Sequence, residues 1–398
     1  MELSRHITGL TGGGSDGWDV FLKARRMIAS GTPVTELTIG EHDIRTAAPI
    51  LQEMHKAALA GHTGYAAVPG IMSLRETVAQ RVTERTGVPT TAANVLITPG
   101  GQAGLFAAHI ATCDPGDTAL FIDPYYATYP GSIRGAGAVP VAIGARAEDD
   151  FQPRAEDIAA QASAAKSLLI NTPINPTGVV YSAKTLDGIA EVCRNDDLWL
   201  VSDEVYDTQV WEGEHISPRS LPDMAERTLV IGSMSKSHAM TGSRCGWIIG
   251  PENAIEHLTN LATHTTYGVP GYIQDASLFA LRQGTVFEAE IAAPFLRRRA
   301  LAREVLAQQN AVRLVPAQGA MYLMLDIRQT GLTGDDFANS LLDTHHIAVM
   351  PGESFGASAA GHIRVAMTVD DDAFQAALVT LLAHAADLVA QNQTAAAS

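Results

Sequence analysis

The chain has 398 residues, of which 46% are hydrophobic and 18% are charged, so its composition excludes a disordered protein and its length favours two domains. The formal net charge of −16 excludes nucleic acid as a partner, because a face that binds phosphates needs a surplus of lysine and arginine. The sequence shows no signal peptide and no run of about 18 uncharged apolar residues, which predicts a cytoplasmic protein that does not bind a membrane.

The first unusual stretch is "TGGGSDG" at 11–17. It lacks the G-K-[ST] ending of a phosphate loop and no strand precedes it, which favours a flexible arm. Between residues 94 and 250, apolar runs with strand character then alternate with helix-like segments. The runs lie at 94–98, 118–123, 139–143, 167–171, 198–203, 228–232 and 246–250. Continuous apolar strands are typical of a parallel-rich sheet covered on both faces, so this region predicts one large α/β domain.

The pattern changes near residue 285. A basic, helix-like segment at 295–310 is followed by an apolar run at 320–327, a helix near 334–343 and short strands at 347–352 and 362–367. This order predicts a smaller α+β domain. No linker rich in proline and serine separates the two regions, so we expect the domains to pack closely.

Cysteine and histidine give no sign of a metal or a disulfide. The three cysteines, Cys113, Cys193 and Cys245, are odd in number and lack C-x-x-C spacing, which predicts free buried thiols in a reducing compartment. The pair His345–His346 has no third ligand at a suitable spacing, so we interpret it as a surface pair at the end of a helix. We expect no metal.

Two loops follow predicted strands at the edge of the sheet. In "TPGGQAGLFAAHI" (98–110) a strand ends, two glycines allow a turn and a helix begins, a place where free N–H groups attract an anion. A purely structural glycine turn is the alternative. In "NTPINPTG" (171–178) two prolines hold Asn175, whose amide could face a ligand. The alternative is that Asn175 only forms the turn.

Two further stretches carry charge in apolar surroundings. In "LWLVSDEVY" (198–206), Asp203 ends an apolar strand, so it either caps the next helix or pairs with a cation such as a protonated ring nitrogen. In "SMSKSHAMTGSRCGW" (233–247), Lys236 lies among small and hydroxyl residues, where a shielded amine has a lowered pKa and attacks aldehydes. Ser233, Ser235 and Arg244 suit a phosphate.

A fifth stretch, "HIRVAM" (362–367), places Arg364 between apolar neighbours in a predicted strand. A guanidinium there needs a carboxylate. Arg364 therefore either pairs within the protein or binds a substrate acid.

The motifs "NPTG", "SDEVY" and "SMSKSHAMTGSRCGW", in this order, resemble those of the class I and II (fold type I) pyridoxal-phosphate aminotransferases, in particular the aspartate aminotransferase superfamily. The likeness extends from "LTIGEHDIRT" (37–46) to the last strand. It implies a large domain with a seven-stranded, mostly parallel sheet flanked by helices. It also implies an N-terminal arm with part of the small domain at 1–48, the cofactor-binding domain at 49–285 and the rest of the small domain at 286–398.

The resemblance also implies a cofactor, pyridoxal 5′-phosphate, and roles around its ring. Lys236 would bind the cofactor covalently and move the proton at the substrate α-carbon. Asp203 would pair with the ring nitrogen and keep it cationic. Asn175 and Tyr206 would hydrogen-bond the phenolic oxygen, and Tyr126 would stack on the ring. Lys236, Asp203 and Tyr206 are thus the implied catalytic residues.

Further residues are implied for the phosphate and the substrate. The phosphate would be held by Gly101, Gln102, Ser233, Ser235 and Arg244. Tyr65 would reach the phosphate of a neighbouring subunit, which implies a homodimer with shared active sites. Arg364 would bind the substrate α-carboxylate beside Asn175, and Gly40 would belong to a mobile segment that closes over the substrate.

The implied reaction is ping-pong transfer of an amino group from an L-amino acid to a 2-oxo acid. The same motifs would suit a β-lyase that cuts C–S bonds or a decarboxylase, and a third alternative is the sensor domain of a transcription regulator. Dicarboxylate-specific relatives use a second arginine that the region 264–272 lacks, which favours neutral or aromatic substrates. His42 and Arg45 either replace that arginine or are surface charges.

Overall fold

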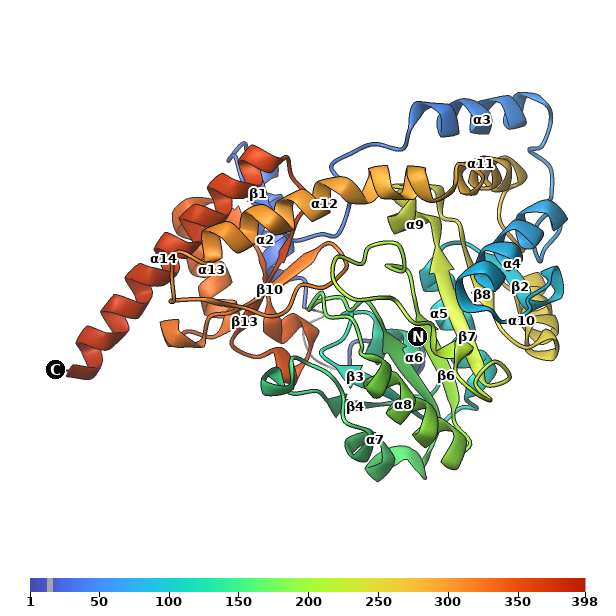
Figure 1. Cartoon of the computed structure of the whole chain (residues 1–398), viewed down its shortest axis with the longest axis horizontal. Helices are drawn as coiled ribbons and strands as arrows, with labels where there is room; N and C mark the ends of the chain where they lie inside the picture. Colours follow the sequence, from blue (N-terminus) through green and yellow to red (C-terminus); the bar gives the residue numbers. More distant parts are fainter. Residues whose placement is uncertain (13–16, 398) are drawn as a thin grey trace.

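The computed structural model describes residues 1–12 and 17–397. The expected flexible arm at 11–17 falls mostly outside the described residues. A seven-stranded sheet has the order β2-β8-β7-β6-β5-β3-β4, and only β8 runs antiparallel to its neighbours (Figure 1). The strands are β2 (Val95–Thr98), β3 (Thr118–Asp123), β4 (Val139–Gly144), β5 (Ala165–Asn171), β6 (Trp199–Asp203), β7 (Thr228–Ser233) and β8 (Gly246–Ile249). The predicted α/β class and the mostly parallel sheet are confirmed.

Each face of this sheet is covered by helices. Successive side chains of a strand point to opposite faces, so apolar strands have apolar groups to bury on both. Leu120, Leu168 and Ile170 pack in one core with helices α7 (Ala155–Ala162) and α8 (Ala183–Asn195). Phe121 and Leu169, the alternate residues, pack in the other core. That second core is closed by α5 (Gly101–Thr112), α6 (Tyr129–Gly135) and α10 (Glu252–His264). Helices on both faces explain why the strands are apolar throughout.

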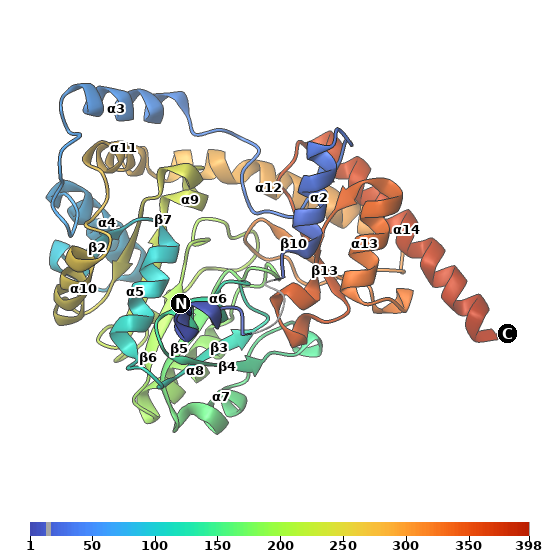
Figure 2. The same cartoon turned by 180° about the vertical axis from the view of Figure 1, so that it is seen from behind.

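Two helices extend this part of the fold at one side. Helix α3 (Ala48–Leu59) packs on α11 (Gly271–Leu281) and stands farthest from the sheet, and α11 in turn contacts α4 (Met72–Thr86) (Figures 1 and 2). Several large apolar side chains near this end are exposed, namely Leu51, Leu59, Tyr65, Met72 and Tyr267. An exposed apolar surface of this kind is typical of a protein–protein interface.

The C-terminal region forms a second, smaller sheet with the order β12-β13-β10-β9, antiparallel throughout. Its elements are α12 (Gly284–Leu306), β9 (Arg313–Leu314), β10 (Tyr322–Asp326), α13 (Gly334–His345), β11 (Ile347–Ala348), β12 (Met350–Pro351), β13 (His362–Ala366) and α14 (Asp371–Ala397). Helix α12 begins before the predicted 295–310 segment and ends at Leu306. The remaining predicted elements of this region are confirmed to within about two residues.

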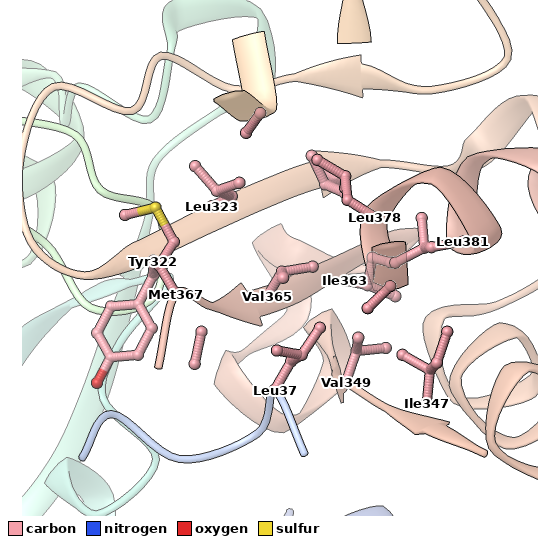
Figure 3. Close-up of a cluster of buried hydrophobic side chains, with 14 of the residues drawn as sticks. Leu37, Tyr322, Leu323, Ile347, Val349, Ile363, Val365, Met367, Leu378 and Leu381 are labelled. Carbon is pink, nitrogen blue, oxygen red and sulfur yellow. The ribbon is translucent and has the colours of Figure 1, made fainter. Parts of the chain in front are cut away.

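The N-terminal region joins this smaller unit. Strand β1 (Thr35–Glu36) pairs in parallel with β11, and helix α2 (Asp19–Ala29) packs on α13. Figure 3 shows that Leu37 enters the same core as Leu323, Val365 and Leu381. The first residues form an arm against α6 (Tyr129–Gly135), where Arg134 donates to the carbonyl oxygen of Leu10 at 3.0 Å. We therefore propose that 1–48 is an N-terminal arm and part of the small domain, that 49–285 is the large domain and that 286–398 is the rest of the small domain.

Helix α14 ends the chain and projects beyond the rest of the molecule (Figures 1 and 2). Its first half buries Phe374, Leu378 and Leu381 in the small-domain core. Among the described residues it is the one helix that is long and apolar enough, at 371–393, to cross a membrane, which the sequence analysis had not expected. The packed core helix of a soluble protein passes the same test of length and composition.

The expected state of the cysteines and of the histidine pair can be checked in the described residues. All three cysteines are free and buried, as predicted. His345 ends α13 and His346 follows it, and both are exposed, as expected for a surface pair.

Arg298 on α12 holds the N-terminal segment to the small domain. Its guanidinium donates to both carboxylate oxygens of Asp43, at 3.0 and 2.6 Å, and to Asp371 Oδ1 at 2.8 Å, while its side chain is only 3% exposed. We expect Arg298→Met to lower the free energy of unfolding by about 2–3 kcal/mol, because the ion pairs are lost and the carboxylates remain partly buried. Denaturant titration measures this loss.

The neighbouring Arg297 provides a matched control. It donates to the same Asp371 at 3.0 Å, but its side chain is 57% exposed. Arg297→Met is therefore expected to cost less than about 1 kcal/mol. Equal losses for the two variants would contradict the proposed anchor.

Candidate functional site

A cavity of about 230 Å³ lies at the carboxyl ends of β5, β6 and β7, where ligands gather in open α/β sheets. Residues from both parts of the fold meet there. The lining includes Trp18, Ile39, Gly40, Gly101, Gln102, Tyr126, Tyr129, Asn171, Asn175, Asp203, Tyr206, Ser233, Ser235, Lys236, Arg244, Tyr322 and Arg364. Every predicted site residue except Tyr65 therefore faces one cavity.

Lys236 lies on the short helix α9 (Met234–Ser237), which begins directly after β7. Its Nζ donates a hydrogen bond to the carbonyl oxygen of Gly40, in the segment that follows β1. Burial lowers the pKa of this amine, as the sequence predicted. A larger fraction of the amine is then unprotonated at neutral pH, the state in which it can act as a nucleophile or a base.

Asp203 ends β6 and is buried. Its Oδ2 accepts a hydrogen bond from the hydroxyl of Tyr129 at 2.7 Å, and its Oδ1 accepts one from the backbone N–H of Val205 at 3.3 Å. Burial raises the pKa of Asp203 to about 6, against the hydrogen bond from Tyr129, which lowers it. Within the described residues no ion pair neutralises this carboxylate, so a cationic ligand would stabilise it.

The N-terminus of α5 and Arg244 form a cradle suited to an anion. Gly100 precedes α5 at φ 81°, and a Cβ placed there would lie 2.2 Å from Arg244 Nη2. Only glycine therefore lets the guanidinium approach the first N–H groups of the helix. Ser233 accepts a hydrogen bond from the backbone N–H of Ser235 at 3.0 Å and donates to its hydroxyl at 2.9 Å. Helix N–H groups, hydroxyls and a guanidinium are the donors that bind phosphate.

Arg364 lies on β13 and is almost completely buried. Its Nη1 donates to Asn175 Oδ1 at 2.8 Å and its Nη2 donates to the carbonyl oxygen of Thr38. No carboxylate pairs with it in the part of the chain that the structure describes, so the internal ion pair that the sequence allowed is not found among those residues. A buried guanidinium without an anion is the strongest sign that this cavity binds an acid.

Two tyrosines expected beside the cofactor ring also line the cavity. The hydroxyl of Tyr206 lies 3.0 Å from the hydroxyl of Tyr322, and the ring of Tyr126 lies edge-on to Tyr129, with centroids 5.7 Å apart. Burial raises the pKa of both Tyr206 and Tyr126, so both are neutral and able to donate hydrogen bonds.

Three further predicted site residues range from buried to almost fully exposed. Gly40 is held against Tyr322, since a Cβ at Gly40 would lie 1.8 Å from the Tyr322 hydroxyl oxygen. Gln102 is exposed at the first turn of α5 and accepts a hydrogen bond from Thr128 at 3.1 Å. Tyr65 is 92% exposed, stacks edge-on with Tyr267 at 5.1 Å and does not reach the cavity of its own chain.

His42 is not the surface charge that the sequence allowed. Its ring is buried and lies edge-on to Phe295 at 5.3 Å. Burial, and then the charge of Lys236, lower its pKa to about 4. A neutral imidazole at pH 7 cannot provide the cation for a second substrate carboxylate. Arg45, the other residue considered, is exposed.

Sequence reasoning missed several polar residues of the cavity, among them Tyr129, Asn171, Thr241 and Tyr322. Tyr129 is the first residue of α6 (Tyr129–Gly135) and Tyr126 lies in the loop before it, so no helical spacing pointed to Tyr129. Asn171 ends β5 and donates to the carbonyl oxygen of Asp203 at 2.9 Å. Tyr322 comes from the smaller sheet and is brought to the cavity only by tertiary packing (Figure 3).

Comparisons with known proteins agree with this geometry. The family model of aminotransferase class I and II matches residues 32–381. The chain is 38% identical to an arginine–pyruvate transaminase of Pseudomonas aeruginosa, over 98% of this chain and all of the relative. It is 30% identical to an aspartate aminotransferase of Geobacillus stearothermophilus, over 95% and 97% of the two chains. The solved aspartate aminotransferase of Thermus thermophilus with maleate superposes with a TM-score of 0.90 at 31% identity, over 96% of this chain and 100% of that one.

Proposed function

This chain belongs to the class I and II aminotransferases, and from that premise we propose which substrates it takes and what its site residues do. Members of this family transfer amino groups with pyridoxal 5′-phosphate, so the chain is a pyridoxal-phosphate-dependent aminotransferase that acts on amino acids and 2-oxo acids. The C–S lyase and decarboxylase alternatives gain no support, since the relatives named above are all aminotransferases.

The cavity fits this cofactor on three observations. Asp203 is a buried carboxylate in need of a cation, Lys236 has a lowered pKa, and the cradle of Gly100 and Arg244 suits a phosphate. When bound, the cofactor supplies an electron sink for the substrate α-carbon. We propose that Asp203 would hold the ring nitrogen of the cofactor and that Lys236 would bind the cofactor covalently.

The remaining proposed roles follow from position in the cavity. Lys236 would remove the proton from the substrate α-carbon and hold it on Nζ for its return. Asn175, whose oxygen faces Arg364, keeps its N–H group for the phenolic oxygen, to which Tyr206 also donates. Tyr126 lies along the ring. The phosphate is held by Gly101, Gln102, Ser233, Ser235 and Arg244.

The proposal that the substrate is an amino acid rests mainly on Arg364. This residue is a buried cation with free bonding capacity toward the cavity, and its Nε has no hydrogen-bond partner among the described residues. A carboxylate binds a guanidinium through paired hydrogen bonds. We propose that Arg364 binds the α-carboxylate of the L-amino acid while the segment that contains Gly40 closes over it.

The active unit is proposed to be a homodimer. Tyr65 is fully exposed beside Tyr267, at the end of the molecule where the exposed apolar side chains gather. A second copy that covers this surface would bury these side chains and bring Tyr65 to the phosphate of its neighbour. The free buried cysteines favour a reducing compartment, so we place the enzyme in the cytoplasm.

We further propose that the donor has a cationic side chain and that pyruvate is an acceptor. The relative at 38% identity is an arginine–pyruvate transaminase. A second cavity, of about 740 Å³, shares Trp18 and Gln102 with the catalytic cavity. Its lining includes four carboxylates and one guanidinium, namely Asp19, Asp123, Asp335, Glu353 and Arg134. Burial, and then the charges of Glu353 and Asp19, raise the pKa of Asp335, and a cation would relieve this repulsion. The preference for neutral or aromatic donors, which the lack of a second arginine at 264–272 favours, stays an untested prediction.

A donor screen with the holoenzyme and pyruvate tests this proposal. We expect kcat/KM for L-arginine to exceed that for L-aspartate by about 100-fold or more, because like charges in a cavity cost several kcal/mol. Asp335→Asn should reduce this ratio, while Glu304→Gln, an exposed change on α12, should leave it unchanged. A preference for L-aspartate or L-phenylalanine would overturn the assignment of the donor but not that of the reaction.

A further inference from the structure

Two aromatic rings flank the guanidinium of Arg364. Its Cζ lies 4.4 Å from the centroid of the Tyr322 ring and 4.3 Å from the centroid of the Phe355 ring, over both rings. We propose that Phe355, together with Tyr322, is a positioning residue that holds Arg364 charged and correctly oriented for the substrate carboxylate. This inference rests on the proposed role of Arg364.

The first step of the argument concerns charge. Arg364 is 2% exposed, and burial lowers its pKa, so water does not stabilise the cation. A carboxylate partner would stabilise it but would also occupy the donors that the substrate needs. An aromatic face attracts a cation through its quadrupole and forms no hydrogen bond with the N–H edge. Two rings therefore stabilise the charge and leave it available.

The second step concerns orientation. A guanidinium is planar, and its N–H groups all point outward in that plane. The close rings of Tyr322 and Phe355 and the hydrogen bonds to Asn175 and Thr38 together limit how far the guanidinium can turn. The Nε atom of the same guanidinium has no hydrogen-bond partner among the described residues. Paired hydrogen bonds to a carboxylate require such a fixed plane.

The third step concerns how the Phe355 ring is held. Phe355 is fully buried in the turn Gly352–Phe355 that follows β12. Its carbonyl oxygen accepts a hydrogen bond from the backbone N–H of Tyr125, at 2.9 Å, in the loop after β3. Phe355 thus links the large sheet to the position of Arg364. The side chain of Phe355 has no polar group, so its effect on carboxylate binding would act only through Arg364.

The test compares holoenzyme variants by their affinity for a carboxylate. The probe is 2-methylalanine, an amino acid with no α-hydrogen, and its dissociation constant is read from the absorbance of the bound cofactor. The rings stabilise Arg364 with and without ligand, so only part of the cation–π energy should appear in binding, and Phe355→Leu should raise the dissociation constant about tenfold. The preference for the best amino acid donor over the amine that lacks its carboxylate should fall by a similar factor.

A matched variant separates orientation from loss of packing. Phe337 on α13 is also fully buried in the small-domain core but contributes no ring to Arg364. Phe337→Leu should lower the free energy of unfolding to a similar extent and leave the dissociation constant of 2-methylalanine within twofold. If Phe355→Leu does not fold, Tyr322→Leu should weaken binding of the probe, while Tyr322→Phe, which keeps the ring, should not.

The possible outcomes are distinct. A dissociation constant for Phe355→Leu within twofold of the wild-type value, with Arg364→Leu at least about 100-fold weaker, would overturn the role of Phe355 and leave that of Arg364 intact. Unchanged binding by Arg364→Leu would overturn the proposed function of Arg364 itself. Equal weakening by Phe355→Leu and Phe337→Leu would mean that any loss of core packing has this effect, and would also overturn the inference.

Discussion

Replacement of Lys236 by alanine is expected to lower the rate of amino transfer by at least about 10⁴-fold, because one side chain provides both the nucleophile and the base. The amine has a lowered pKa in a shielded position, and methyl is too short to replace either function. Single-turnover mixing with the best amino acid donor, followed by cofactor absorbance, measures the rate of the α-proton step directly.

The control for this variant is Lys184→Ala, an exposed lysine on α8, which should keep the wild-type rate. A small amine such as methylamine, added to Lys236→Ala, should restore part of the proton transfer because it can enter the space left by the side chain. Turnover of Lys236→Ala at more than about a hundredth of the wild-type rate would contradict the assignment of Lys236 as the base.

Replacement of Asp203 by asparagine is expected to have opposite effects on stability and on catalysis. Burial raises the folded-state pKa of Asp203 from 3.8 to about 6, so the folded state binds this proton more tightly than the unfolded state does. Above pH 6 the ionised carboxylate therefore destabilises the cofactor-free protein, by about 3 kcal/mol for a shift of this size. This cost disappears as the pH falls from 6 to 3.8. At pH 7.5, cofactor-free Asp203→Asn should be more stable than the wild-type protein.

The measurement is denaturant unfolding of the cofactor-free proteins at pH 7.5 and pH 4. The gain from Asp203→Asn should shrink toward zero at the lower pH, and pyridoxal phosphate should stabilise the wild-type protein more than the variant. The rate of amino transfer should fall about 10³-fold, since the charge that holds the ring nitrogen is lost. Asp197→Asn, at a side chain 95% exposed beside Arg227, should change stability by less than about 0.5 kcal/mol. A gain that is the same at both pH values would show that ionisation of Asp203 is not its source.

Much of the fold was predictable because its signals are local. The seven apolar runs became seven strands because a strand covered on both faces is apolar along its whole length. Helix α12 was placed only in part, since its first turns, from Gly284, alternate apolar and charged residues without a clear period. Helix α14 was not recognised as a long apolar helix, because Gln375, Thr380 and His384 interrupt the run.

In the candidate site, too, some residues were predictable from local sequence and others were not. Asp203, Lys236 and Asn175 follow strand ends that converge at one edge of a parallel sheet, so their proximity follows from the order of the strands. His42 was misjudged because its neighbours Glu41 and Asp43 are polar, whereas the packing of Phe295 on α12 decides that its ring is buried.

The sequence by itself determined the large sheet, the lysine and the buried acid of the site, because strand composition and short motifs are properties of neighbouring residues. Only the tertiary structure decided that Arg364 has no carboxylate partner among the described residues, that Phe355 and Tyr322 cover its guanidinium, and that Tyr129 holds Asp203. These contacts join residues that are 9, 42 and 74 positions apart, the last as the hydrogen-bond separation records. Packing within each domain places them together, and the charge of a buried group depends on every neighbour that packing brings to it.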